Sequence, residues 1–387
     1  MKKVLLTAIL IFALLTTVMF GNQITEAKIY QNITIKADGS VNPSTAPIQN
    51  VGNIYTFIDD IFGEIAVERD SVIVDGNGFK LQGSGSGMGL SLRMADNVTV
   101  QNTNIQNFTV GIEIGSNNTI SGNTVRDSIY GLYSNGGPYN SIISGNNLTS
   151  NDVGIYFWGA SHITVSGNNI IKNSEGFHIY GSHNTISGNN ITSNTVNGLF
   201  LYNSCSNNTI SGNTIKNNSK GIYIVHSWNN TFFENNIADN NRGMDFFLDH
   251  SQSSNNTIYS NNFANNNLHI LISTESVNVW DNGVEGNYWD NYTGVDSNNN
   301  GIGDTPFVIS GYNIDRYPIM PAIIKESPSP NISPTPTQQP TPSWTPIHTD
   351  RGAPNLRTFY MIVGVVALAL IIIIVAVALV YFRKHKK

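Results

Sequence analysis

The chain has 387 residues, of which only 12% are charged, with a formal net charge of −6 at pH 7 and a single cysteine, Cys205. Sparse and mildly acidic charge without a basic patch excludes nucleic acid as a partner, and one cysteine excludes an intramolecular disulfide. A solenoid needs no disulfides, because each coil buries the faces of its neighbours.

The first predicted element is a secretory signal over residues 1–27. Residues 1–3 make a short basic start, and an apolar run over residues 4–20 follows. Thr25 and Ala27 are small residues of the kind that signal peptidase requires before its cleavage site. Because the apolar run is near the length that spans a bilayer, an uncleaved N-terminal anchor is the alternative.

Residues 28–72 are expected to cap one end of a solenoid whose repeats occupy residues 73–279. The sequence Asn-Thr-Ile-Ser-Gly-Asn occurs at 118–123, 184–189 and 208–213, and its variants recur at steps of roughly 20 to 26 residues. Steps of this length are typical of solenoid coils. The last positions of the aligned repeats are Asn77, Thr103, Asn123, Asn146, Asn168, Asn189, Asn213, Asn235 and Asn261.

Each repeat contains a second short block of alternating character, as at residues 154–157 and 198–201. Such blocks indicate strands, because they are too short and too often interrupted by Gly and Asn for helices. Each coil should therefore have about three strands, stacked about 4.8 Å from their copies in the next coil. The predicted fold is all-β: a right-handed parallel β-helix solenoid of about nine coils, plus one C-terminal transmembrane helix.

Asn is expected at the corners of the coils for two reasons. It tolerates left-handed backbone angles, and identical Asn side chains one coil apart hydrogen-bond as a ladder. Many Asn residues also stand in Asn-X-Ser/Thr sequons, so N-glycans would coat the surface in an organism that attaches them. Alternatively, the turn of the repeat requires Asn before Thr, and the sequons arise only as a by-product. The apolar column expected to point inward is Ile120, Ile143, Val165, Ile186, Ile210, Phe232 and Ile258.

An aromatic stripe is expected on the outside of the coils. If residues such as Ile155 and Phe157 point inward, their neighbours in the strand point outward. Rings at coil spacing on a flat sheet suit stacking on sugars, and exposed apolar area of this extent marks a contact surface. The alternative is that the rings only shield the strands or pack under a loop. The predicted ligand-binding residues are Tyr156, Trp158, His178, Tyr180, Phe200, Tyr202 and Tyr223.

His162 and His183 occupy the same place in consecutive repeats, where other coils carry Asn. Stacked about 5 Å apart, they would be close enough to share a transition metal with His178 or Cys205. The alternative is that the two histidines only replace Asn in a column of turns.

Catalytic machinery is not evident, and whether the chain is an enzyme stays open. A glycosidase on this scaffold would need two or three carboxylates that converge on a groove. Only Asp245 clearly falls in the outward column. The acidic residues are otherwise scattered, as Asp127, Asp152, Glu175 and Asp249.

Residues 280–322 are expected to form a C-terminal cap that contains a calcium loop. Oxygen ligands at positions 1, 3, 5 and 9, with Gly at 6, match the spacing of such loops. The twelfth position is Phe307 instead of Glu, so the prediction is a weak structural site suited to millimolar calcium, with a plain polar turn as the alternative. The predicted ligands are Asp296, Asn298, Asn300, Ile302 through its carbonyl, and Asp304.

The C-terminal part predicts a stalk and a membrane anchor. Residues 323–356 are rich in Pro, Thr and Ser, which favours an extended spacer. Residues 357–387 contain an apolar run long enough to cross a bilayer of roughly 30 Å, followed by a basic end. Positive residues stay in the cytoplasm, so the prediction is a single-pass cell-surface protein. Its expected partners are the membrane and a polysaccharide or envelope protein.

The repeats resemble those of the NosD-like proteins, in the wider pectate-lyase-like family of right-handed β-helices. The resemblance covers about residues 50 to 322 and rests on the Asn-Thr-Ile-Ser-Gly-Asn repeats and on residues 73–79. The closing segment, residues 286–318, looks like that of archaeal cell-surface members. NosD proteins are described as periplasmic copper-binding proteins linked to nitrous oxide reductase maturation, so the resemblance implies copper. The stalk and tether argue against transferring that role whole.

The residues and the resemblance together predict a membrane-anchored cell-surface β-helix protein that serves as a structural, glycan-binding or partner-binding display module. Two alternatives stay open. One is a carbohydrate-active enzyme on the same fold, namely a polysaccharide lyase, hydrolase or epimerase. The other is a NosD-like copper-binding protein.

Overall fold

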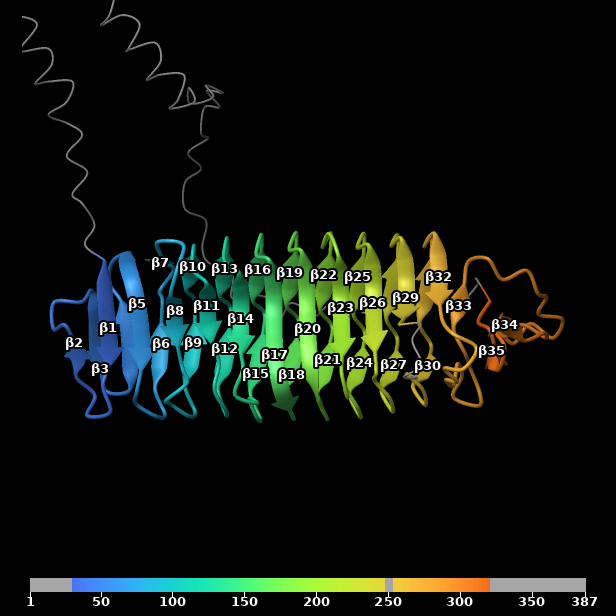
Figure 1. The fold of residues 1–387 in the computed structure, drawn as a ribbon, viewed down its shortest axis with the longest axis horizontal. Helices are drawn as coiled ribbons and strands as arrows, with labels where there is room; N and C mark the ends of the chain where they lie inside the picture. The colour runs from blue at the N-terminus through green and yellow to red at the C-terminus, as the bar shows by residue number, and fades with distance from the viewer. Residues whose placement is uncertain (1–29, 248–252, 321–387) are drawn as a thin grey trace, which may run out of the picture. The chain divides into compact units, whose positions relative to one another are not determined.

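The computed structural model describes residues 30–247 and 253–320 (Figure 1). The chain divides into two units, Met1–Ser327 and Pro328–Lys387, and every described residue belongs to the first. The predicted signal, the predicted stalk and the predicted transmembrane segment all lie outside the described residues. Within the two described stretches, the structure has no helix that would be able to span a membrane.

The described residues form a right-handed parallel β-solenoid, as predicted, with its coils stacked in chain order (Figure 1). Three sheets run along it, here called A, B and C. Sheet B has ten strands in parallel succession, β4 to β30, which makes about ten coils where about nine were predicted. The earliest of these strands, β4 (Ile54–Phe57), pairs with β6 (Ile73–Asp75) although its sequence lacks the Asn-rich repeat.

Along the solenoid, each coil contributes one strand to each sheet, next to the strand from the preceding coil. Sheet A contains β1 (Gln31–Ile35), β2 (Val41–Asn42), β5 (Ile61–Val67), β8 (Met88–Ser91), β11 (Val110–Glu113), β14 (Tyr130–Ser134), β17 (Val153–Ser161), β20 (Glu175–Ser182), β23 (Asn197–Tyr202), β26 (Lys220–Val225), β29 (Arg242–Phe246) and β32 (Leu268–Leu271). Sheet B contains β3 (Ile48–Val51), β4, β6, β9 (Thr99–Gln101), β12 (Thr119–Ser121), β15 (Ile142–Ser144), β18 (Thr164–Ser166), β21 (Thr185–Ser187), β24 (Thr209–Ser211), β27 (Thr231–Phe233) and β30 (Thr257–Tyr259). Sheet C contains β7 (Lys80–Gln82), β10 (Asn104–Gln106), β13 (Thr124–Arg126), β16 (Asn147–Thr149), β19 (Asn169–Ile171), β22 (Asn190–Thr192), β25 (Thr214–Lys216), β28 (Asn236–Ala238), β31 (Asn262–Ala264) and β33 (Tyr288–Trp289), and β5 pairs in it as well.

The core is a set of apolar columns that run along the solenoid. Because side chains alternate along a strand, the middle residue of each three-residue strand in sheets B and C points inward. The predicted inward column is confirmed, since all seven members, from Ile120 to Ile258, are at most 1% exposed. Sheet A adds two further columns, which include Ile155 and Phe157 and are equally buried.

Ladders of buried Asn side chains run along the corners between the sheets, as predicted. In each ladder, the side-chain oxygen accepts a hydrogen bond from the backbone N–H of the Asn one coil earlier. Buried polar groups are thereby paired, so the ladders help to hold the coils in register without disulfides. The three ladders contain Asn184, Asn208, Asn230, Asn256 and Asn278; Asn123, Asn146, Asn168, Asn189, Asn213, Asn235, Asn261 and Asn287; and Asn151, Asn173, Asn194, Asn218, Asn240 and Asn266.

The prediction that Asn adopts left-handed backbone angles at the corners is confirmed for residues such as Asn207 (φ +55°) and Asn229 (φ +57°), but it does not hold for the ladder Asn themselves. The left-handed residue is the one before the ladder Asn, as at Gly188 (φ +62°) before Asn189 and Glu234 (φ +55°) before Asn235. Glycine adopts this conformation at no steric cost, which accounts for Ser-Gly-Asn in the repeat. The ladder Asn is selected instead for its side-chain donor and acceptor.

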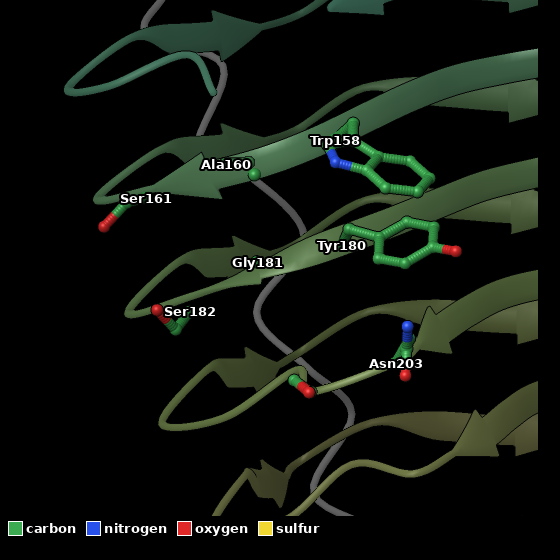
Figure 2. A pocket seen from close by; sticks show the side chains of 9 residues that line it. Trp158, Ala160, Ser161, Tyr180, Gly181, Ser182 and Asn203 are labelled. Carbon is green, nitrogen blue, oxygen red and sulfur yellow. The ribbon is translucent and has the colours of Figure 1, made fainter. Parts of the chain in front are cut away.

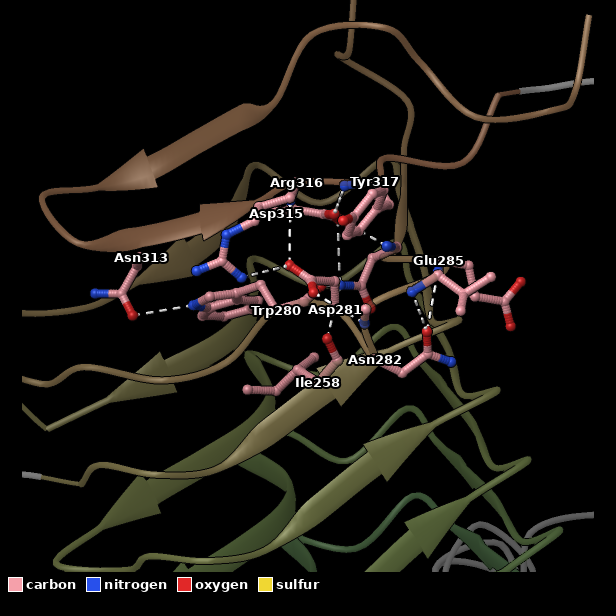
Figure 3. Close-up of polar contacts among 12 residues, drawn as sticks. Ile258, Trp280, Asp281, Asn282, Glu285, Asn313, Asp315, Arg316 and Tyr317 are labelled. Atoms are coloured by element: carbon pink, nitrogen blue, oxygen red, sulfur yellow. Dashed lines mark hydrogen bonds and ion pairs between the residues drawn. The ribbon is translucent and has the colours of Figure 1, made fainter.

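The C-terminal end is closed by the hairpin of β34 (Phe307–Ser310) and β35 (Asn313–Asp315). Asn313 accepts hydrogen bonds from the backbone N–H of Asn278 (3.0 Å) and from the Trp280 indole (3.0 Å), which extends one ladder (Figure 3). Asp315 accepts from the Asn287 N–H (2.7 Å) and the Trp289 indole (2.8 Å), which extends another. The hairpin therefore supplies the last acceptors of two ladders.

Asp315 should make the stability of this cap depend on pH. Burial raises the pKa of its carboxyl to about 6 from 3.8, although N–H donors from Trp289 and other residues oppose the shift. A carboxyl with a raised folded-state pKa contributes stability that is complete below about pH 4 and lost as the pH rises through about 6. We expect the free energy of unfolding to fall by about 3 kcal/mol from this group. Chemical denaturation of wild type and Asp315→Asn from pH 4 to 7 measures it, and parallel pH profiles would contradict it.

Candidate functional site

The seven residues predicted to bind a ligand all lie on the outer side of sheet A. They come from β17, β20, β23 and β26, in strands whose alternate residues are buried. Six of the side chains are partly buried, while Trp158 is 45% exposed. The structure therefore brings the seven residues onto one surface, here called the aromatic face.

The rings of the aromatic face contact one another along the solenoid, and two of the pairs between successive coils are stacked. Trp158 and Tyr180 have ring centroids 4.0 Å apart at 29°, and Phe200 and Tyr223 are 4.8 Å apart at 24°. Other pairs in successive coils meet edge to face, as Tyr180 and Tyr202 do at 4.8 Å and 89°, so coil spacing brings the rings into contact in more than one geometry. Trp158 is the first ring of its column. The preceding coil carries Gly136 and Gly137 after β14 and so has no side chain there to cover Trp158, which explains its exposure.

Two further tyrosines belong to the aromatic face and were missed in the sequence. Tyr133 lies one coil before Tyr156 with the rings 5.6 Å apart at 13°, and Tyr130 lies 5.3 Å from the ring of Tyr156. The signal was present, because Gly-Leu-Tyr at 131–133 repeats the pattern of Gly-Ile-Tyr at 154–156.

A hollow of about 360 Å³ lies beside Trp158 and Tyr180 (Figure 2). A register shift between Phe157 and Ala160 marks a bulge in β17 there. Two aromatic rings and several hydrogen-bonding side chains around one hollow are the mixture expected of a small-molecule site. The hollow is lined by Trp158, Gly159, Ala160, Ser161, Tyr180, Gly181, Ser182, Asn203 and Ser204.

Asp245, the one clearly outward acid of the sequence, is already paired. Its carboxylate is 2.7 Å from the Arg242 guanidinium and 3.2 Å from the Lys220 ammonium, and the residue is 3% exposed. Glu175 lies on the same side of sheet A but three coils earlier, which is about 14 Å at coil spacing. That separation exceeds the distances between glycosidase carboxylates, so these two acids do not form a catalytic pair.

His162 and His183 stack as predicted, with ring centroids 5.3 Å apart at 4°. Both have left-handed backbones (φ +58° and +59°), and Nδ1 of His162 is hydrogen-bonded to the Ser161 hydroxyl (2.7 Å). They therefore adopt the same turn as the residues at the equivalent place in other coils. Those residues are Asn117, Asn140, Asn207, Asn229 and Asn255, with φ between +54° and +59°.

The described residues do not fit a copper site at the histidine pair. Cys205 is fully buried, its thiol donates to the carbonyl of Ile179 (3.1 Å), and burial raises the pKa of that thiol to about 11. A metal binds the thiolate, so a metal at Cys205 would have to displace the thiol proton and break this hydrogen bond inside the core. Within residues 30–247 and 253–320, no three His, Cys, Asp or Glu side chains gather closely enough to hold a metal ion.

The predicted calcium loop is a tight turn in the cap. The Asp296 carboxylate accepts hydrogen bonds from the backbone N–H groups of Asn300 (3.1 Å) and Gly301 (2.8 Å). Hydrogen bonds from the Ser297 side chain and from its backbone N–H (2.9 Å) lower the pKa of Asp304. They also place the Asp304 carboxylate beside the start of the loop. Phe307, at position twelve, stacks on Trp289 (4.8 Å) and so belongs to the packing of the cap.

Comparisons with known proteins agree on the fold. A family model described as "Periplasmic copper-binding protein (NosD)" matches residues 18–182 and 139–294. Among solved structures, the Dettilon tailspike protein is similar at 14% identity and a TM-score of 0.50, over 68% of this chain and 57% of the tailspike. The A-module of a mannuronan C-5 epimerase from Azotobacter vinelandii has 14% identity and a TM-score of 0.41, over 65% of this chain and 89% of the module.

A third structure, the tailspike of E. coli bacteriophage HK620 in complex with a pentasaccharide, has 12% identity and a TM-score of 0.39, over 60% of this chain and 48% of that protein. No curated protein sequence matches. At such identities these likenesses concern the fold alone, and this chain spans little more than half of the Dettilon tailspike.

Proposed function

This chain belongs to the NosD family, and we propose that it is a cell-surface module that binds polysaccharide through the aromatic face. The family description refers to periplasmic proteins, which supports a location outside the cytoplasm. The described residues do not supply a copper site at the histidine pair, so the proposal rests on the aromatic face and not on copper.

The observation that carries the proposal is the hollow beside Trp158 and Tyr180. The exposed ring of Trp158 offers an apolar surface for the C–H groups of a sugar, in the way that aromatic side chains anchor interfaces. Ser161, Ser182 and Asn203 line the same hollow and offer hydroxyl and amide groups to sugar hydroxyls (Figure 2). Apolar and hydrogen-bonding groups within one hollow match the two kinds of surface that a sugar presents.

A glycan-array screen of the purified full chain, followed by mass spectrometry of any bound glycan, tests the proposal. Binding that leaves the glycan unchanged is expected. Cleaved or epimerised glycan would favour a carbohydrate-active enzyme, and an array without any bound glycan would contradict binding altogether.

The same proposal includes anchoring by residues 357–387, with residues 323–356 as the stalk and residues 1–27 as a cleaved signal. The composition of these segments supports it. Protease treatment of intact cells should release a fragment that contains the solenoid, while a fragment with the basic C-terminus stays with the membrane.

We further propose that the loop at residues 296–304 binds calcium in the cap. Its carboxylates are near each other through the turn, and at a Kd of about 1 mM, typical of weak extracellular sites, 10 mM calcium would stabilise the fold by about 1.4 kcal/mol. We expect the melting temperature of the full chain to rise by about 2–4 °C with 10 mM CaCl₂. Asp296→Asn should abolish the rise, and an equal rise with MgCl₂ or in the variant would contradict a specific site.

A further inference from the structure

We propose that Glu175, His178 and Asn197 form a hydroxyl-binding centre within the aromatic face, and that this centre selects a neutral sugar residue over an acidic one. The inference rests on the proposed function and specifies its ligand class. Glu175 and Asn197 occupy equivalent places in neighbouring strands, β20 and β23, and His178 lies in the adjoining outward column.

The three side chains are joined through the carboxylate of Glu175. One oxygen of Glu175 is 3.1 Å from Nδ1 of His178, and the other accepts a hydrogen bond from the Asn197 amide at 2.9 Å. A carboxylate accepts a hydrogen bond, so Nδ1 of His178 carries the hydrogen and, in the neutral ring, Nε2 carries a lone pair. Nε2 of the neutral His178 ring and the side-chain oxygen of Asn197 are therefore both acceptors.

Those two acceptors have no partner of their own. Nε2 of His178 and the side-chain oxygen of Asn197 are buried and make no hydrogen bond among the described residues, and Asn197 is 3% exposed. A buried acceptor without a donor costs about 1–3 kcal/mol. In the part of the chain that the structure describes, three other buried side-chain atoms also lack partners, on Gln31, Ser254 and Asn262. Among these described atoms, two belong to one hydrogen-bonded cluster only at Glu175.

The centre lies directly beneath the rings of the aromatic face, so a bound sugar reaches it when one ring moves aside. The ring of His178 is 5.0 Å from Tyr156, 4.4 Å from Phe200 and 5.8 Å from Tyr180, which also lines the hollow. These neighbouring rings are partly exposed, and side chains at a surface change rotamer within nanoseconds. A sugar that displaces the edge of one ring would bring its hydroxyls to the unpaired acceptors.

The chemistry of the centre decides the class of sugar. Two unpaired acceptors and one carboxylate call for donors, which hydroxyl groups supply. A carboxylate or sulfate brings only acceptors and a negative charge, so it would be repelled by Glu175 and leave the acceptors unpaired. The basic groups nearest along the same columns, Lys220 and Arg242, are both paired with Asp245. The centre should therefore favour neutral sugars.

The test compares neutral and acidic glycans on one array, probed with the full chain and with two variants. His178→Phe/Asn197→Leu keeps apolar bulk in place of the acceptors, and we expect it to lose at least tenfold in affinity for neutral glycans. Glu175→Gln keeps the size of the side chain and removes its charge, and we expect the preference to move at least threefold toward carboxylate-bearing glycans. Melting curves establish that each variant is folded.

Asn262→Leu is the matched control, because Asn262 also has a buried, unpaired oxygen but lies in sheet C. Its binding should equal that of wild type. Neutral glycans bound equally by all variants would overturn the centre, as would a wild type that binds only acidic glycans, while binding through the aromatic face would still stand. If wild type binds no glycan, the proposed function itself fails and the centre with it.

Discussion

Asn189→Ala is expected to lower the free energy of unfolding by about 3–5 kcal/mol, which is a large effect for one buried side chain. Asn189 is 1% exposed, and its oxygen accepts from the backbone N–H of Asn168 at 2.9 Å. Its amide donates to the carbonyl of Val165 (2.9 Å) and to the side-chain oxygen of Asn213 (2.9 Å). Truncation leaves the buried backbone N–H of Asn168 without a partner, at about 1–3 kcal/mol. It also removes the side-chain bonds to Val165 and Asn213, worth about 0.5–1.5 kcal/mol each, although Asn213 still accepts from the backbone N–H of Asn189 (2.9 Å).

The neighbouring residue provides the control for this prediction. Asn190 is exposed, and its amide donates to the side chain of Asn169 (2.7 Å) at the surface. Asn190→Ala should change the free energy of unfolding by no more than about 0.5 kcal/mol. Both variants are compared by urea denaturation after production in a host that does not glycosylate Asn, because Asn190 stands in a sequon. A loss below 1 kcal/mol for Asn189→Ala would show that the ladder does not stabilise the coils.

Trp158→Ala/Tyr180→Ala is expected to weaken glycan binding about 100-fold. Aromatic anchors of an interface commonly cost more than about 1 kcal/mol each when truncated, and a combined loss of about 2.7 kcal/mol corresponds to this factor. The two rings stack at 4.0 Å and form one wall of the hollow, so removing them also removes its shape. Titration calorimetry of the strongest array ligand measures the loss.

A second ring column serves as the control for the aromatic face. Phe233 and Tyr259 stack at 5.4 Å and 8°, but they lie on sheet B. Phe233→Ala/Tyr259→Ala removes the same kind of surface from another side of the solenoid, and its glycan affinity should stay within twofold of wild type. Equal losses in the two double variants would place binding elsewhere and contradict the role of the aromatic face.

Much of the fold was predictable because the repeat places the same residue type at the same point of every coil. Ile120 and its successors point inward since strand side chains alternate with a period of two. Asn189 and its equivalents form a ladder since parallel coils in register put identical amides one above another. The interpretation of His162 and His183 as replacements for Asn in a turn also follows the repeat, and their φ values match those of the Asn turns.

Other features depend on neighbours that no periodic pattern specifies. The bulge after Phe157 and the hollow beside it arise where one coil departs from the repeat. The sequence places Asp245 on the outside of the coil but does not show its partners. The structure shows that it pairs with Lys220 on the preceding coil and with Arg242 on the same coil.

The sequence by itself determined the solenoid, its inward columns and its ladders, because each depends on regularities repeated in nearly every coil. Only the tertiary structure decided which acids are paired, which ring keeps a free face and which acceptors of His178 and Asn197 lack a donor. Those properties depend on single contacts between side chains that are some 20 residues apart in the sequence. Such contacts depend on rotamers and bulges, which the repeat pattern does not specify.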